Sequence, residues 1–157
     1  MPTAIGSTRY EAEMEMKAIT PASSATPGRV LVCEDDACLA LEVELALRDA
    51  GVCQVSVCPS AALAMAALET VHPDAIVIDS HLADRDDAWA LAELIAFLGP
   101  KPPKIVFSTA TPDEIPPEVA RLGTIIEKPY EPYLLVEALI SGSPGGLFSR
   151  VREALHR

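Results

Sequence analysis

Polar residues that could do chemistry stand at the ends of short apolar runs in this sequence. They are Glu34, Asp35, Asp79, Thr109 and Lys128. The runs are rich in β-branched residues, which predicts strands buried on both faces of a sheet. A lone carboxylate after a strand is often only a turn residue or a helix cap. Because parallel strands end at one edge of a sheet, however, we expect these five side chains to share one site.

The chemistry of such a site follows from its charges. Three carboxylates in one cleft repel one another and raise each other's pKa values. A hard divalent cation relieves that repulsion, and oxygen ligands with open water positions suit Mg²⁺. Lys128 adds a point positive charge and Thr109 a hydroxyl donor. Aspartate carboxylates are nucleophiles toward phosphorus, so the set predicts a Mg²⁺-dependent aspartyl-phosphate site at Asp79.

The elements that must position these residues alternate along the chain. Strands are expected near residues 30–33, 54–57, 74–79, 105–108 and 124–126. Helical spacing of apolar residues fills the first three connections and recurs after the last strand. The fourth connection contains three prolines within 111–117, which leaves only 118–122 for a helix. We therefore predict a doubly wound α/β fold with helices on both faces and a fourth helix that is weak or absent. Its five-stranded parallel sheet would have the order 2-1-3-4-5.

Composition divides the chain and restricts its partners. Residues 1–28 are predicted to be an N-terminal tail and linker, 29–140 one domain, and 141–157 a linker and short amphipathic tail. A net charge of −11 argues against nucleic acid as a partner. The sequence has neither an apolar run of membrane length nor a signal peptide pattern, which predicts a cytoplasmic protein. The four cysteines are expected to be buried, reduced thiols. No glycine-rich phosphate loop is present, which disfavours dinucleotide-binding and P-loop enzymes.

Residues 29–140 resemble the receiver domain of bacterial two-component response regulators. The matching segments are Val30–Asp35, Ala75–Asp79, Phe107–Ala110 and Glu127–Tyr130. They occur in the family's order and at roughly its spacing. The resemblance implies a single-domain response regulator rather than an enzyme with an external substrate. It would accept a phosphoryl group from a histidine kinase or phosphotransfer protein, then signal by contact with a downstream protein or by phosphate shuttling.

The resemblance also implies a role for each site residue. Asp79 would be the phospho-acceptor. Asp35 and Asp79 would bind Mg²⁺ directly, Glu34 would bind it through a water, and His81 would offer the metal its backbone carbonyl. Thr109 would bond the phosphoryl oxygen and would shift its position on activation. Finally, Lys128 would pair with Asp79 or its phosphate, and the peptide bond before Pro129 would be cis.

The sequence departs from the family at several positions. Ala83 and Asp87 replace a proline and a glycine that many receivers carry, and Ile125 replaces the usual aromatic switch residue. The short, proline-rich segment Thr111–Gly123 is similar to that of an atypical, mainly alphaproteobacterial subgroup. In that subgroup the fourth helix is shortened or mobile. We hypothesise that ordering of this segment is the switch.

Two other functions compete with this interpretation. A degenerate receiver would bind a partner without phosphorylation, but the complete set of site residues argues against it. A phosphatase of the haloacid dehalogenase class also uses an aspartate at a strand end. Those enzymes need a second aspartate two residues later, and His81 holds that position here.

Overall fold

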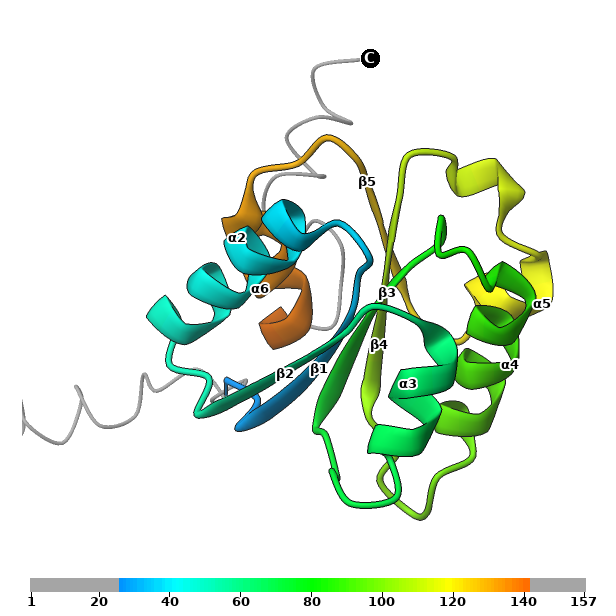
Figure 1. The fold of residues 1–157 in the computed structure, drawn as a ribbon, viewed down its shortest axis with the longest axis horizontal. Helices are drawn as coiled ribbons and strands as arrows, with labels where there is room; N and C mark the ends of the chain where they lie inside the picture. Colours follow the sequence, from blue (N-terminus) through cyan, green and yellow to red (C-terminus); the bar gives the residue numbers. More distant parts are fainter. Residues whose placement is uncertain (1–25, 142–157) are drawn as a thin grey trace, which may run out of the picture.

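The computed structural model describes residues 26–141 (Figure 1). These residues include the whole predicted domain. Of the predicted tails 1–28 and 141–157, residues 1–25 and 142–157 lie outside the described residues. Within the described range, no helix is both long and apolar enough to cross a membrane.

A five-stranded parallel sheet forms the centre of the domain, in the predicted order β2-β1-β3-β4-β5. Its strands are β1 (Arg29–Cys33), β2 (Gln54–Cys58), β3 (Ala75–Asp79), β4 (Lys104–Thr109) and β5 (Thr124–Glu127). All five residues of β3 are buried, as expected for a central strand covered on both faces. Since all strands run the same way, their carboxyl ends meet at one edge.

Helices cover both faces of this sheet (Figure 1). They are α2 (Ala37–Asp49), α3 (Ala61–Ala67), α4 (Arg85–Ala96), the 3₁₀ helix η1 (Pro112–Glu114), α5 (Pro117–Ala120) and α6 (Pro132–Ser141). One face carries α2 and α6, and the other carries α3, α4 and α5. Asp36 begins α2 by accepting hydrogen bonds from the backbone N–H groups of Cys38 and Leu39, and Ser60 caps α3 by accepting one from Leu63.

The fourth helix is as short as its prolines predict, because a proline ring fits only the first turn of a helix. The connection from β4 to β5 contains η1 and the single turn α5, which begins at Pro117. Val119 is the buried residue of α5 and anchors the turn against α4 and the sheet.

The loop after β3 is short and ends in acidic residues. Asp86 and Asp87 form the first turn of α4, where negative charge is favourable. Asp84 accepts hydrogen bonds from the backbone N–H groups of Ala61 and Ala62, each 3.1 Å long. It therefore satisfies two backbone donors at the start of α3 that the helix itself leaves unpaired.

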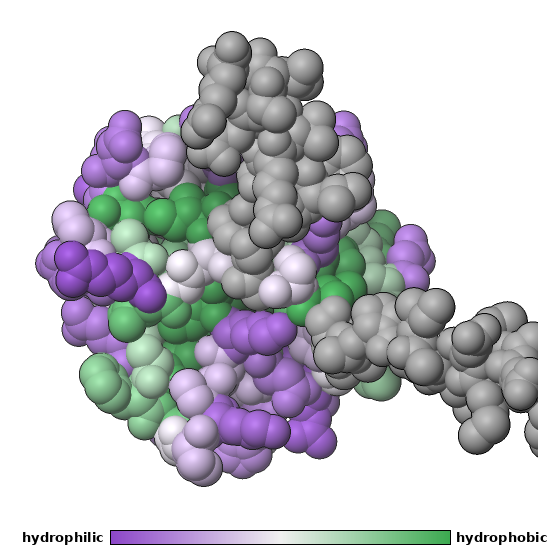
Figure 2. Space-filling view, turned by 180° about the vertical axis from the view of Figure 1, so that it is seen from behind, coloured by the Kyte–Doolittle hydropathy of each residue, from purple (hydrophilic) through white to green (hydrophobic). Residues whose placement is uncertain are grey.

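Two apolar layers hold the helices to the sheet. Ile76, Ile78 and Phe107 pack toward α3, α4 and α5. Val77 and Val106 pack toward α2 and α6 on the other face, as strand alternation requires. On the face shown in Figure 2, hydrophobic residues reach the surface in patches between hydrophilic ones.

The cysteines only partly match the expectation of buried thiols. Cys33 and Cys58 are buried in the core, but Cys38 and Cys53 are exposed. Cys38 lies in the first turn of α2, opposite the side that faces the sheet, and Cys53 lies in the turn before β2.

The close approach of Gly123 to β4 gives a stability prediction. A Cβ atom at position 123 would lie 2.5 Å from the backbone oxygen of Ile105 and 2.9 Å from its Cβ. Gly123→Ala must therefore push β5 away from β4, and we expect it to lower the free energy of unfolding by about 1–3 kcal/mol. Urea unfolding of both proteins measures this.

Gly28→Ala is the matched control, because its Cβ would meet only Asp74 Oδ2 at an ordinary 3.4 Å. Equal stability of the two variants would contradict the close packing at Gly123.

Candidate functional site

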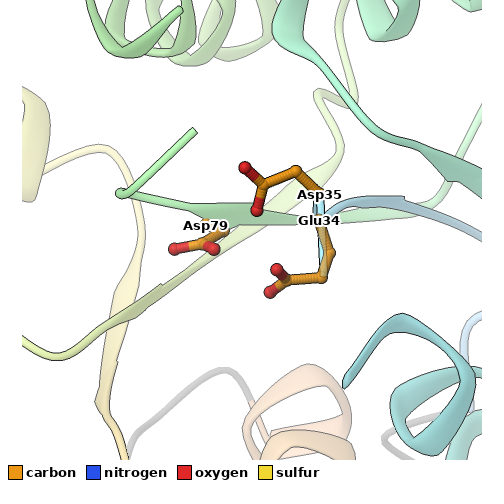
Figure 3. Close-up of side chains that lie close together, drawn as sticks. All are labelled: Glu34, Asp35 and Asp79. Carbon is orange, nitrogen blue, oxygen red and sulfur yellow. The ribbon is translucent and has the colours of Figure 1, made fainter. Parts of the chain in front are cut away.

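The carboxylates of Glu34, Asp35 and Asp79 converge at the carboxyl edge of the sheet. β1 and β3 are neighbours, so the two residues after β1 lie beside the last residue of β3. One carboxylate oxygen from each residue lies within 4.8 Å of the others. Figure 3 shows Asp35 and Glu34 leaving the end of β1 on opposite sides, with Asp79 beside both. Glu34 and Asp79 are only 6% and 3% exposed, whereas Asp35 is exposed.

Lys128 supplies the positive charge of this group. Its Nζ lies 3.2 Å from Asp79 Oδ2 and 3.4 Å from Glu34 Oε2. The residue follows β5, and its backbone N–H donates a 2.7 Å hydrogen bond to the carbonyl of Thr109. The peptide bond between Lys128 and Pro129 is cis, as predicted. The lysine thus reaches the carboxylates from the far side of β4.

Burial and neighbouring charges shift the pKa values of Glu34 and Lys128. Burial raises the pKa of Glu34 from 4.5 to about 7, and the negative charge of Asp79 adds to this effect. A hydrogen bond from the Asp36 backbone and the charge of Lys128 act in the opposite direction. Partial burial lowers the pKa of Lys128, but the carboxylates of Asp79 and Glu34 outweigh it and raise that pKa. Lys128 is therefore held in its charged form.

The side chain of Thr109 belongs to a buried hydroxyl pair. It stands at the end of β4, as predicted, and is fully buried. Its Oγ1 accepts hydrogen bonds from Ser80 Oγ at 2.6 Å and from the Thr111 backbone at 3.0 Å. Ser80 was not among the predicted site residues, although a serine directly after Asp79 was a visible signal.

His81 contributes more than a backbone group. Its N–H donates a 2.9 Å hydrogen bond to Asp79 Oδ1, so its main chain lies beside the carboxylate. Its ring also bridges two loops: Nδ1 lies 3.1 Å from Ser80 Oγ, and Nε2 lies 3.3 Å from Thr111 Oγ1. The ring therefore links the loop after β3 to the segment after β4, which the spacing of residues did not predict.

A second hydroxyl pair lies on the opposite face of the sheet. Ser108 is 1% exposed, and its Oγ lies 2.8 Å from the hydroxyl of Tyr130. Ser108 is also the register partner of Asp79 on β3. A serine inside an apolar strand was the sequence feature that could have indicated this pair, because a buried hydroxyl needs a hydrogen-bonding partner.

The donor set of this site fits a Mg²⁺ ion. It offers carboxylate oxygens, and Asp35 remains accessible to solvent. A hard cation prefers such oxygens and keeps several waters when few protein ligands bind it. Burial, with the charge of Asp79 adding to it, raises the pKa of Glu34, and a nearby cation would favour the ionised form of this carboxyl group. Glu34, Asp35 and Asp79 would hold the ion, and a phosphoryl oxygen could occupy one of its water positions.

The pKa of Glu34 predicts how stability depends on pH in chelator-treated protein. Between pH 4.5 and about 7, the folded state keeps a proton on Glu34 that the unfolded chain has lost. The stabilising contribution of this group is therefore complete below pH 4.5 and disappears as the pH rises to about 7. Relative to wild type, Glu34→Gln should gain stability across this range and level off above it.

Denaturant unfolding at a series of pH values measures this difference. Glu42→Gln, on the exposed side of α2, is the matched control. A pH-independent difference between Glu34→Gln and wild type would contradict the raised pKa.

Comparisons with known proteins agree with this geometry. A family model described as the response regulator receiver domain matches residues 30–140. A response regulator receiver domain from Methylobacillus flagellatus is similar at 27% identity, with a TM-score of 0.63, over 72% of this chain and 96% of that one. A sensor protein from Polaromonas sp. JS666 is similar at 26% identity, with a TM-score of 0.62, over 73% of this chain and 94% of that one.

The fold is also shared with more distant structures. The chemotaxis response regulator CheY4 of Vibrio cholerae matches 71% of this chain and 95% of its own, with a TM-score of 0.58 and 21% identity. No curated protein matches the chain. The family model nevertheless includes part or all of every strand and every residue of the site, and so the chain belongs to the response regulator receiver domain family.

Proposed function

We propose that this protein is a cytoplasmic response regulator that takes a phosphoryl group onto Asp79. The donor would be a histidine kinase or a phosphotransfer protein. Output would be phosphorylation-dependent contact with another protein, or transfer of the phosphoryl group onward. The observation that carries this proposal is the position of the Asp79 carboxylate, which lies 3.2 Å from Lys128 Nζ and within 4.8 Å of carboxylate oxygens of Glu34 and Asp35.

Each neighbour of Asp79 has a function in this chemistry. Asp35 and Asp79 would hold Mg²⁺ directly and Glu34 through a water, with the His81 carbonyl as a further oxygen. The ion, when bound, would offset charge on the transferring phosphoryl oxygens. Lys128, already 3.2 Å from Asp79, would neutralise part of the same charge. Thr109 would donate its hydroxyl hydrogen to a phosphoryl oxygen.

Members of this family are signalling modules and do not turn over an external substrate. A degenerate receiver that only binds a partner remains the alternative function. The ion pair between Lys128 and Asp79 counts against it, because a partner-binding surface does not require a buried carboxylate at 3% exposure.

Phosphorylation is tested by intact mass spectrometry after incubation with acetyl phosphate and Mg²⁺. We expect one phosphoryl adduct on the wild-type protein, which chelator and Asp79→Asn both abolish. Asp86→Asn, an exposed aspartate in the first turn of α4, should retain the adduct. Absence of an adduct both with acetyl phosphate and with a histidine kinase, together with no binding of Mg²⁺, would favour the partner-binding alternative.

We further propose that the segment Thr111–Gly123 responds to phosphorylation. Three contacts connect it to the site and to α4. The Thr111 backbone bonds to Thr109, its hydroxyl bonds to His81, and Glu114 forms a 2.8 Å ion pair with Arg85. A shift of Thr109 toward a phosphoryl group would break the first of these contacts.

Hydrogen exchange of backbone amides measures this response. Adding Mg²⁺ and beryllofluoride, a phosphoryl mimic, should change the protection of residues 111–123 while the protection of α2 stays constant. Asp79→Asn with the same additions is the control. Unchanged protection of the segment in wild-type protein that has bound the mimic would contradict the switch.

A further inference from the structure

We propose that the hydrogen bond between Ser108 and Tyr130 positions Lys128 for phosphoryl transfer. Tyr130 is then a positioning residue that acts through the lysine. This inference rests on the proposed phosphorylation of Asp79 and extends it to residues beyond the carboxylates, the threonine and the lysine.

The first support is the direction of the side chains. Along β3 and β4, Val77 and Val106 point toward α2 and α6. Side chains alternate along a strand, so Asp79 and Ser108, two residues later, point to this same face. The two are register partners on neighbouring strands. Ser108 therefore lies next to the phospho-acceptor, on the face from which Lys128 reaches it.

The second support is that the turn after β5 is tied to β4 at both ends. At its start, the Lys128 N–H donates to the carbonyl of Thr109 at 2.7 Å. At its end, the Tyr130 hydroxyl meets Ser108 Oγ at 2.8 Å. Only Pro129 lies between these attachments. The backbone that carries the lysine is thus held against the strand that borders Asp79.

The third support is that Tyr130 lies within the electrostatic field of the site. Its ring packs against the apolar cluster under α2 and α6. Burial raises the pKa of its hydroxyl, and the charges of Lys128, Glu34 and Asp79 also act on that pKa. The hydroxyl is therefore close to the charged groups, at the boundary between them and the core.

Lysine needs such support more than most side chains. Its ammonium group sits on a flexible stem with four carbons, and its charge has no preferred direction. Lys128 must hold one position between two carboxylates while its side chain is only 20% exposed. A phenylalanine at position 130 could fill the same space, but it could not bond to Ser108 and would leave that buried hydroxyl unpaired.

The test compares Tyr130→Phe and Ser108→Ala with wild type, using acetyl phosphate and Mg²⁺. Each variant should slow the initial rate of phosphoryl adduct formation by about five- to tenfold, as expected when a charged group is slightly misplaced. The double variant should be no slower than either single one, because both remove the same hydrogen bond. The Mg²⁺ dissociation constant, measured by calorimetry, should not change, since the carboxylates are intact.

A matched control is available on α6. Tyr133→Phe removes a hydroxyl from a tyrosine that is 60% exposed and should leave the rate unchanged. The decisive comparison uses Lys128→Ala as background. There, Tyr130→Phe should slow phosphorylation no further, whereas general loosening of the fold would still reduce the rate.

The outcomes separate the two proposals. A wild-type protein that accepts no phosphoryl group from acetyl phosphate or from a kinase refutes the proposed function, and this inference with it. A phosphorylated wild type with an equally fast Tyr130→Phe refutes the inference alone. So does a further loss of rate in the Lys128→Ala background, or a weaker affinity for Mg²⁺.

Discussion

Buried negative charge is the constraint on which the rest of this structure depends. Glu34 and Asp79 are taken out of water at the ends of two central strands, with Asp35 beside them. Isolated carboxylates are costly to bury, so the fold must supply a counter-charge, neutralise a group or bind a cation. It supplies Lys128, and it raises the pKa of Glu34 to about 7. Both responses reduce the cost of burying these carboxylates at one site.

The order of the strands is what brings these charges together. Asp35 and Asp79 are far apart in the sequence, but β1 and β3 are neighbours because the chain reverses direction across the sheet at this point. Such a reversal leaves a crevice at the carboxyl edge, where the helices diverge to opposite faces. Lys128 arrives from the edge strand β5, beyond β4. A different strand order with the same sequence motifs would separate the charged side chains of the site.

Most of the fold, and the charged residues of the site, could be predicted from sequence because they depend on periodicity and on the geometry of parallel sheets. Consecutive β-branched residues indicated β3, and prolines indicated the short α5. What could not be predicted depends on contacts between distant segments. Asp84 resembled a loop residue because its partners, the first N–H groups of α3, lie 22 and 23 residues away. The hydroxyl pairs were missed for the same reason, since single serines carry no periodic signal.

The same hydroxyl pairs divide the site between the two faces of the sheet. Thr109 and Ser80 bond to each other on the side of α3, α4 and α5, where His81 extends the contact to Thr111. Ser108 and Tyr130 bond on the side of α2 and α6. Hydrogen bonds fix direction as well as distance, which apolar packing does not. Asp79 therefore stands between two directional networks. The first leads to the proline-rich segment that we propose as the switch, and the second leads to the lysine. Because separate strand residues, Thr109 and Ser108, anchor them, the segment proposed as the switch and the turn that carries Lys128 are held by different hydrogen bonds.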